Sequence, residues 1–372
     1  MIETGRGGAL IKEYKDNDTK DIMREYFNHP AWGMNWGDPV PDMPLDVQLE
    51  LVNRCNLDCL SCNPGKQKRK LSFLEWDTMK RIVDEAAEEG VAYFTICGIG
   101  EASMHPDLFK LFQYIRSKDV VPKGLRRFNF MPSVLISNGK WSQAQVDSCI
   151  ENPPDLVSFS LAGITDEDII TRRKGLDLDK FIQNVDKIYC NRKVVREADG
   201  GLSPTIHIST HLYPDEMVNM KAEIEAFKTK FFPICDVIVI KSTEITPELH
   251  DHNRFIVASD DIRNIGYENI SESHFVRTAP CFETSRRLSV DSDGNVWCGH
   301  HYSENFGVFL GNVKEQTLRE IWHSEKMNKY RLQVRAGIFY RPLCQQCGGE
   351  IREFHKKATM QMEQEITFKV LD

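Results

Sequence analysis

Near the start of the chain, three cysteines lie within eight residues, as Cys55, Cys59 and Cys62 in the spacing C-x3-C-x2-C. Thiolates this close together can coordinate three irons of a cubane iron–sulfur cluster, which leaves the fourth iron without a protein ligand. A cluster that only transfers electrons normally has four cysteine ligands, so a set of three predicts a further ligand from outside the protein. A zinc-binding loop and three unrelated thiols are the alternatives.

A second group of cysteines lies near the C-terminus, at Cys281, Cys298, Cys344 and Cys347. The segment 288–298 has an Asp-Gly pair in its middle, which predicts a β-hairpin that ends at Cys298. Four thiolates from a hairpin and a distant C-x2-C pair can complete a tetrahedral metal site, either for an iron–sulfur cluster or for zinc. This second set therefore predicts a closed site.

The segments between these two groups alternate strands with helices. From residue 46 onward, six strand–helix units predict a parallel sheet that curves into a barrel or partial barrel. The loops after the strands form the functional side of such a barrel, and the first cysteine group follows the first strand. The predicted strands span residues 47–52, 93–97, 133–137, 156–161, 205–212 and 237–241. The predicted helices span residues 72–89, 107–117, 142–151, 178–192 and 216–230.

Local signals mark where this regular pattern begins. Ser72-Phe-Leu-Glu75 has the form of a capping box, and Gly90 is suited to end the helix that it opens. The preceding residues, 1–44, are irregular and rich in aromatic side chains. We expect them to form an arm over the main domain, with one short helix near residues 20–27.

Polar residues alternate with apolar ones in two of the predicted strands. In the fifth strand His207, Ser209 and His211 share one face, and in the first strand Gln48 and Glu50 do so. Helices packed outside a barrel would bury the apolar faces, so we expect the polar faces to line a cavity. Edge strands with one face in water are the alternative.

Small and polar residues follow the second, third and fourth predicted strands. The two glycines of Cys97-Gly-Ile-Gly-Glu101 would let a ligand approach the backbone closely. The corresponding segments after the third and fourth strands are Ser137-Asn138-Gly139, Ser160-Leu-Ala-Gly163 and Arg173-Lys-Gly175. Each segment is weak evidence alone, but they occur in order along one predicted sheet edge.

Together with the cysteine triplet, these segments resemble the motifs of the radical S-adenosylmethionine (radical SAM) superfamily. The resemblance implies a [4Fe–4S] cluster whose open iron binds the amino and carboxylate groups of S-adenosylmethionine. Two departures from the family pattern are Ala162, where many relatives have aspartate, and Ser61, where an aromatic residue is common. The implied cofactor-binding residues are Gly98, Gly100 and Glu101 at the methionine amino group, Ser137 and Asn138 near the ribose and methionine portions, Ser160 at the ribose, and Arg173 at the carboxylate.

The C-terminal cysteines resemble the Twitch form of the SPASM auxiliary-cluster domain, since no cysteine follows Cys347. The resemblance implies one auxiliary [4Fe–4S] cluster with four protein ligands. The expected fold is α/β, a partial (β/α)6 TIM-like barrel with a C-terminal Twitch/SPASM-like auxiliary cluster domain. The expected divisions are an N-terminal arm at 1–44, a radical SAM partial barrel at 45–245, a connector at 246–275, the auxiliary domain at 276–355 and a tail at 356–372.

This resemblance also implies an oxidoreductase that cleaves S-adenosylmethionine reductively to a 5′-deoxyadenosyl radical, which removes a substrate hydrogen. Because an auxiliary cluster could accept a second electron, we expect a two-electron oxidation of a small polar metabolite such as a sugar or cyclitol. His207, His211 and Glu50 are candidate bases because each is expected to point inward. The alternatives are radical modification of a peptide or protein side chain, and radical epimerisation, for which Cys97 is the suitably placed thiol.

Composition limits the partners. The 372 residues include 41% hydrophobic and 27% charged residues, and the formal charge of −8 argues against a broad nucleic-acid-binding surface. No apolar run approaches a membrane span, and the N-terminus lacks a secretory-signal pattern. Clustered cysteines without an export signal indicate metal binding in a reducing cytoplasm. We expect a small-molecule or peptide substrate and a reductase or flavodoxin-type electron donor, with no membrane or nucleic-acid partner.

Overall fold

The computed structural model describes residues 9–14, 40–59, 69–118, 131–194, 202–212, 220–242, 283–298 and 308–335. Within these ranges strands alternate with helices, and the strands form one ten-stranded sheet and one two-stranded sheet. This alternation confirms the predicted α/β fold class.

Six parallel strands form the centre of the large sheet. They pair in the order β2 (Asp46–Leu49), β3 (Tyr93–Ile96), β4 (Ser133–Ser137), β5 (Leu156–Ser160), β8 (Thr205–Leu212) and β9 (Val237–Ser242). Each of them overlaps a strand that the sequence predicts, so the six-unit partial barrel is confirmed.

Strands from both ends of the chain extend this parallel centre. β10 (Arg287–Val290) pairs parallel with β2, and β11 (Asn295–Cys298) and β12 (Phe309–Asn312) continue antiparallel beyond it. β1 (Ala9–Tyr14) pairs antiparallel with β9 at the other edge. Both additions differ from the sequence expectations, because the sequence predicts an irregular arm and a hairpin that belongs to a separate domain. In each case an edge strand of the barrel gains a backbone hydrogen-bonding partner.

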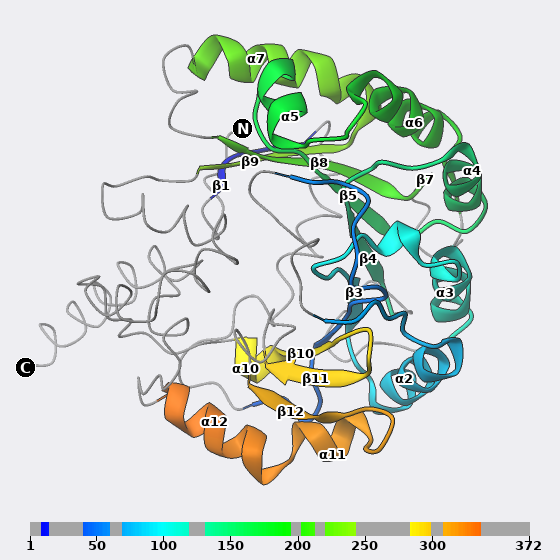
Figure 1. The fold of residues 1–372 in the computed structure, drawn as a ribbon, viewed down its shortest axis with the longest axis vertical. Coiled ribbons are helices and arrows are strands. Elements are labelled where there is room, and N and C mark those ends of the chain that lie inside the picture. Colours follow the sequence, from blue (N-terminus) through cyan, green and yellow to red (C-terminus); the bar gives the residue numbers. More distant parts are fainter. Residues whose placement is uncertain are drawn as a thin grey trace, which may run out of the picture.

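Helices cover the convex side of the curved sheet (Figure 1). The five predicted helices are confirmed as α2 (Trp76–Glu89), α3 (Leu108–Arg116), α4 (Gln143–Glu151), α6 (Leu178–Cys190) and α7 (Met220–Phe231). The other elements are α5 (Asp166–Arg172), α10 (Glu283–Arg286), α11 (Leu318–Trp322), α12 (Glu325–Arg335), the 3-10 helices η3 (Ala102–Met104) and η5 (Phe232–Ile234), and the hairpin of β6 (Lys193–Val194) and β7 (Leu202–Ser203). None of the helices described is long and apolar enough to cross a membrane. The helix predicted near residues 20–27 lies outside the described residues.

The ends of two helices test the predicted caps. Gly90 ends α2 in the left-handed conformation, at φ 74°, as the sequence predicts. The predicted capping box at Ser72 is wrong, because Glu75 is the N-cap and makes no side-chain cap hydrogen bond. The Ser72 hydroxyl lies 2.6 Å from the hydroxyl of Ser292 on the C-terminal hairpin instead. The Ser72 hydroxyl, which the sequence predicts to cap the helix, is therefore used in a tertiary contact.

The main hydrophobic core lies between the convex face of the sheet and the helices. Leu49, Phe94 and Ile208 are among the strand residues that are fully buried there. Phe159 of β5 packs edge-on against Trp141 and Phe181, with ring centroids 5.2 and 5.6 Å apart. Burial of each such large side chain stabilises the fold by about 1.5–3 kcal/mol, which fixes the strands whose ends carry the site.

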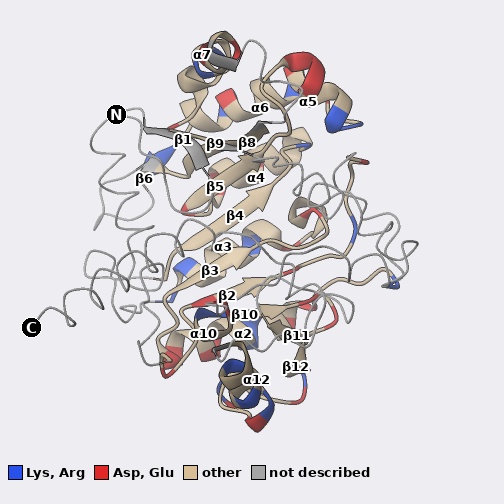
Figure 2. Cartoon of the chain, turned by 90° about the vertical axis from the view of Figure 1, so that its left-hand side faces the viewer, with Lys and Arg blue, Asp and Glu red and all other residues tan. Residues whose placement is uncertain are grey.

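The opposite, concave face has two different parts. On β10, β2 and β3 it carries charged and phenolic side chains that are buried, such as Arg287, Asp46 and Tyr93. On β4 and β5 it is uncharged and partly accessible, and Ile136 is 39% exposed. Charged residues gather on outer helices such as α5, α7 and α12, whereas β3, β4 and β5 carry none (Figure 2).

Candidate active site

The first cysteine group follows β2 at the C-terminal end of the barrel strands. Cys55 is half-buried and Cys59 is buried, while Cys62 lies outside the described residues. The Cys55 sulfur accepts hydrogen bonds from the backbone N–H of Leu57 and from Asn138 Nδ2, both at 3.4 Å. Burial raises the pKa of the Cys55 thiol above its usual value, so a bound cation would be needed to favour the thiolate there.

Two neighbouring loops hold this cysteine loop in place. Asn56 donates to the carbonyl of Lys140 at 2.9 Å, and the Lys140 ammonium donates back to the carbonyl of Asn56 at 3.0 Å. On the other side, the backbone N–H of Asp58 donates to the carbonyl of Lys174 at 3.1 Å. The segments after β4 and β5 thus fix the loop that follows β2, as expected for adjacent loops of one barrel.

Glu101 joins the loops that follow β3 and β4. Its buried carboxylate accepts hydrogen bonds from the Ser137 hydroxyl at 2.7 Å, the Asn138 backbone N–H at 2.8 Å and the Ser103 backbone N–H at 3.2 Å. Three of the predicted cofactor-binding residues, Glu101, Ser137 and Asn138, are therefore in direct contact. The carboxylate of Glu101 orders the two loops, and the nearby backbone stays in place to contact a ligand.

The two glycines of the same loop allow a very close approach of neighbouring groups. A Cβ atom on Gly98 would lie 2.4 Å from Glu50 Cγ, and one on Gly100 would lie 1.9 Å from the carbonyl oxygen of Val52. Any other residue would push the β3 loop away from the start of the cysteine loop. The glycines thus serve packing between the two loops as well as access to the backbone.

Arg173 points toward the cysteines from the segment after α5. Its Nη2 donates to the Ser160 hydroxyl at 2.6 Å, and its Nη1 lies 3.7 Å from the Cys59 sulfur. Its buried Nε has no hydrogen-bond partner among the described residues. A guanidinium with an unused donor beside cysteine sulfurs suits an anionic cluster and a carboxylate ligand, so these residues fit the implied cofactor.

The three candidate bases have different surroundings. His207 and His211 lie on the face of β8 opposite the buried Ile206 and Ile208, which confirms the predicted alternation. Glu50 is ion-paired with Arg69 at 2.7 Å and accepts from the backbone N–H of Ile99. Burial raises the pKa of Glu50, although Arg69 opposes this effect. Glu50 is therefore engaged within the protein, and the roles of His207 and His211 in proton transfer stay predictions.

The second cysteine group is described at one position. Cys298 ends β11 and is buried, and its sulfur accepts from the Val308 backbone N–H at 3.4 Å. Cys281, Cys344 and Cys347 lie outside the described residues, as does Cys62 of the first group. The assignment of all seven cysteines as metal ligands stays a prediction.

Arg69 and Asp291 are two functional candidates that the sequence motifs do not identify. Arg69 pairs with Glu50 and lies 3.5 Å from Asp291 of the C-terminal hairpin. No local spacing connects residues so far apart in sequence. The only sequence signal is the turn pattern around Asp293-Gly294, which predicts the hairpin but not its contact with the barrel.

Comparisons with known proteins agree with this geometry. Two family models match the chain: the radical SAM superfamily at residues 49–196, and an iron–sulfur cluster-binding (SPASM) domain at residues 281–348. The PqqA peptide cyclase of Gluconobacter oxydans is 27% identical over 312 residues, covering 78% of this chain and 80% of the cyclase. The mycofactocin maturase of Mycobacterium tuberculosis is 23% identical over 201 residues, covering 48% of this chain, and the match spans about half (51%) of the maturase.

A solved structure shares the fold. The structure of anSMEcpe with bound AdoMet superimposes with a TM-score of 0.54 at 16% identity, and the match covers 86% of this chain and 94% of that protein. At this level of identity the likeness concerns the arrangement of the strands and helices alone.

Proposed function

The chain is a radical SAM enzyme with a C-terminal SPASM-type domain, and on this premise we propose that it modifies a side chain of a peptide or protein. The enzyme binds S-adenosylmethionine and iron–sulfur clusters. The small-metabolite oxidation expected from the sequence is less well supported, because two of the similar curated proteins are peptide cyclases by name. We therefore prefer radical modification of a peptide or protein side chain, which the sequence leaves open as an alternative.

The observation that carries this proposal is the similarity to the PqqA peptide cyclase, which extends over about four fifths of both chains. The concave face is consistent with such a substrate. Its uncharged part offers Ile136, which is partly exposed, beside Ser158 of the next strand. An uncharged surface of this kind can receive a peptide side chain without leaving a buried charge unpaired.

The residues of the site would divide the work as follows. Cys55, Cys59 and Cys62 would hold the first cluster, and Cys281, Cys298, Cys344 and Cys347 would hold one auxiliary cluster. When bound, S-adenosylmethionine and its cluster supply the radical that removes a hydrogen atom, and the auxiliary cluster supplies an acceptor for a second electron. Arg173 and the backbone of Gly98 and Gly100 would orient the cofactor, and His207 or His211 would accept the departing proton. A reductase or flavodoxin-type protein would deliver the first electron.

Anaerobic reconstitution tests the proposal. Two [4Fe–4S] clusters require about eight irons per chain, and Cys55→Ala should abolish formation of 5′-deoxyadenosine from S-adenosylmethionine under dithionite. The substrate class is tested by comparing peptide pools with pools of sugars and cyclitols as stimulants of that reaction. Stimulation by peptides, with substrate deuterium appearing in 5′-deoxyadenosine, supports the proposal. Stimulation by the sugars or cyclitols alone would overturn it.

One observation favours epimerisation as a second candidate. Cys97 follows β3 at the functional end of the barrel, and burial raises the pKa of its thiol to about 12. The thiol therefore stays protonated at neutral pH, which is the form that can return a hydrogen atom to a radical. In deuterium oxide an epimerase would place deuterium in the product, and Cys97→Ser would abolish this. Product without solvent deuterium would exclude the role.

A further inference from the structure

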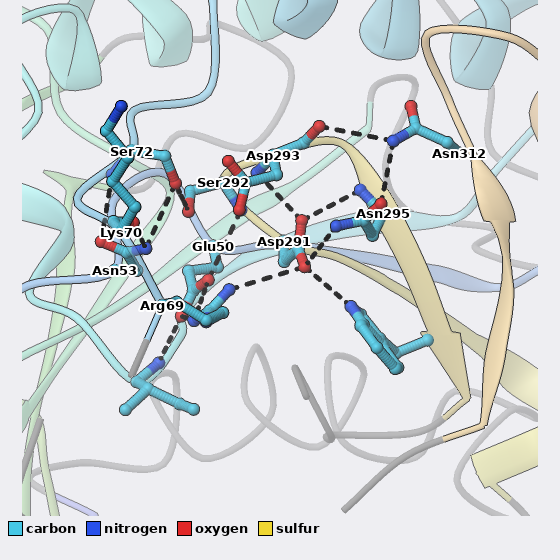
Figure 3. Close-up of polar contacts among 12 residues, drawn as sticks. Glu50, Asn53, Arg69, Lys70, Ser72, Asp291, Ser292, Asp293, Asn295 and Asn312 are labelled. Carbon is cyan, nitrogen blue, oxygen red and sulfur yellow. Dashed lines mark hydrogen bonds and ion pairs between the residues drawn. The ribbon is translucent and has the colours of Figure 1, made fainter. Parts of the chain in front are cut away.

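A chain of ionic contacts joins the barrel to the C-terminal hairpin (Figure 3). Its members are Glu50 after β2, Arg69 on the return from the cysteine loop, and Asp291 at the turn between β10 and β11. The side chains of Glu50 and Asp291 are fully buried, and Arg69 contacts both of them. These contacts lie outside the set of residues that we assign to the cofactor, so they call for a separate explanation.

Glu50 fixes the loop that follows β3. Its Oε1 accepts a hydrogen bond from the Ile99 backbone N–H at 3.0 Å. Its Cγ occupies the space that a side chain on Gly98 would need. A shift of Glu50 would therefore displace the backbone of Gly98 and Gly100, which we propose contacts S-adenosylmethionine.

Arg69 connects this loop to the hairpin and to the cysteine loop. Its Nη2 donates to the two carboxylate oxygens of Glu50 at 2.9 and 2.7 Å, and its Nη1 lies 3.5 Å from Asp291 Oδ2. Its carbonyl accepts from Arg54 Nη2 at 2.7 Å, next to Cys55. A planar guanidinium can serve two carboxylates at once, which the single ammonium of lysine cannot do with the same geometry.

Asp291 connects Arg69 to the hairpin residues next to Cys298. Its Oδ1 accepts from the backbone N–H groups of Asp293 and Asn295, both at 2.9 Å, and so fixes the turn. Its Oδ2 accepts from the indole N–H of Trp297 at 2.8 Å, and Trp297 directly precedes Cys298. The position of the cysteine is thereby linked to the charge on Asp291.

We propose that Glu50, Arg69 and Asp291 are positioning residues that couple the cofactor loop to the hairpin of the auxiliary site. The inference rests on the proposed function, because it takes Gly98–Gly100 as a cofactor contact and Cys298 as a cluster ligand. Neutralising any member leaves the others buried without their partner, so the group must rearrange as a unit. By linkage, a change at either end alters the other end.

The experiment changes a residue on the hairpin and measures cofactor binding, and it changes a residue beside the cofactor loop and measures the auxiliary cluster. Asp291→Asn, on the hairpin, is expected to weaken equilibrium binding of S-adenosylmethionine to the reconstituted enzyme about fivefold or more. Glu50→Gln, on the cofactor side, is expected to shift the EPR spectrum and midpoint potential of the auxiliary cluster. That second measurement uses a Cys55→Ala/Cys59→Ala/Cys62→Ala background, so that the auxiliary cluster alone gives the signal.

Asp236→Asn is the matched control. Asp236 is also a buried carboxylate paired with an arginine, Arg192, at 2.6 Å, and it accepts from the Ile206 backbone N–H at 2.7 Å. It lies at the N-terminal ends of β8 and β9, whereas the site lies at the C-terminal ends of the barrel strands. We expect Asp236→Asn to lower the melting temperature and to leave both cofactor binding and the auxiliary-cluster spectrum unchanged.

Wild-type binding in Asp291→Asn at full iron content would overturn the coupling, and so would equal effects in Asp236→Asn. Should Asp291→Asn not load iron, Arg69→Lys takes its place, with weaker binding and a shifted auxiliary spectrum expected from the same two measurements. Wild-type values in Arg69→Lys would then overturn the inference. Failure of the wild-type enzyme to bind S-adenosylmethionine would overturn the proposed function instead.

Discussion

At the scale of single residues, the guanidinium of Arg173 brings a half-buried positive charge to the cysteine loop. It donates to Ser160 at 2.6 Å and lies 3.7 Å from the Cys59 sulfur. Its Nε has no hydrogen-bond partner among the described residues. The preceding residue, Arg172, instead faces Asp168 of α5 at 3.8 Å. Two adjacent arginines are therefore directed to different surroundings, which makes one a matched control for the other.

Arg173→Ala is expected to weaken binding of S-adenosylmethionine by roughly 10- to 150-fold, because hydrogen bonds to charged groups contribute about 1.5–3 kcal/mol each. Arg173→Lys should retain only part of the affinity, since lysine keeps the positive charge but lacks the several N–H donors of the planar guanidinium. Equilibrium binding to the reconstituted enzyme measures both. An equal loss in Arg172→Ala would show that the effect is not specific to Arg173.

His105 gives the fold a predictable dependence on pH. Desolvation lowers the pKa of this buried side chain below its ordinary 6.5. The Asp107 backbone N–H donates to its Nδ1 at 3.1 Å, and its Nε2 lies 3.0 Å from the Leu74 carbonyl, so the ring is neutral in the folded state. The unfolded state therefore binds more protons just below pH 6.5, and acid favours unfolding.

We expect the contribution of His105 to the free energy of unfolding to be largest above pH 6.5 and to fall as the pH drops from 6.5 toward the lowered folded pKa. His105→Gln keeps a donor for Leu74 and removes the titration, so its stability should depend less on pH in this window. Urea unfolding at a series of pH values checks this. Parallel pH profiles for the two proteins would contradict it.

At the scale of elements, the site is a set of loops that hold one another. The β3 loop approaches the start of the cysteine loop so closely that Gly100 has no room for a side chain. Gly175, which lies shortly after the end of α5, has a φ of 93° but only ordinary contacts around its position. Gly100 is thus required for lack of space, whereas Gly175 is required for its backbone conformation.

Gly100→Ala is expected to abolish or strongly reduce iron uptake, because its Cβ would fall 1.9 Å from the Val52 carbonyl and displace the cysteine loop. Gly175→Ala should cost about 1–2 kcal/mol of stability from the left-handed backbone and leave iron uptake intact. Iron and sulfide counts after reconstitution, with melting temperatures, compare the two. Normal iron content in Gly100→Ala would refute the packing argument.

At the scale of the whole molecule, the C-terminal hairpin is part of the barrel sheet. β10 pairs with β2 along Arg287–Val290, and Arg287 forms a buried ion pair with Asp46 across the two strands. Burial raises the pKa of Asp46, against the effect of Arg287. The segment that leads to Cys298 therefore depends on β2 for its backbone hydrogen bonds and on Asp46 for the pairing of the Arg287 charge.

Arg287→Met is expected to cost about 3–5 kcal/mol, since it leaves Asp46 buried without its cation, and Arg287→Met/Asp46→Asn should recover part of this loss. Arg319→Ala removes a more exposed arginine that bridges Asp42 and Glu89, and it should cost much less, because ion pairs in contact with water contribute little to stability. Urea unfolding of the three variants measures the differences. Equal costs for the two single variants would contradict the role of burial.

The sequence by itself determined the repeating elements and the chemistry they carry. Spacing predicts the cysteine triplet, alternation predicts β8 and its inward polar face, and glycine predicts the end of α2, because each of these depends on neighbours in the chain. The same alternation of strands and helices predicts that the loops after the strands meet at one end of the barrel. These loops carry Glu101, Ser137, Asn138, Ser160 and Arg173. These features are local, so the order of residues is enough to reveal them.

Only the tertiary structure decided which distant groups meet. Ser72 contacts Ser292 in place of capping α2, Glu50 pairs with Arg69 in place of facing a substrate, and β10 joins β2. Each outcome depends on a buried polar group or a strand edge that needs a partner, and several partners would satisfy it equally well. Packing of the whole chain selects one of them, which no local spacing can specify.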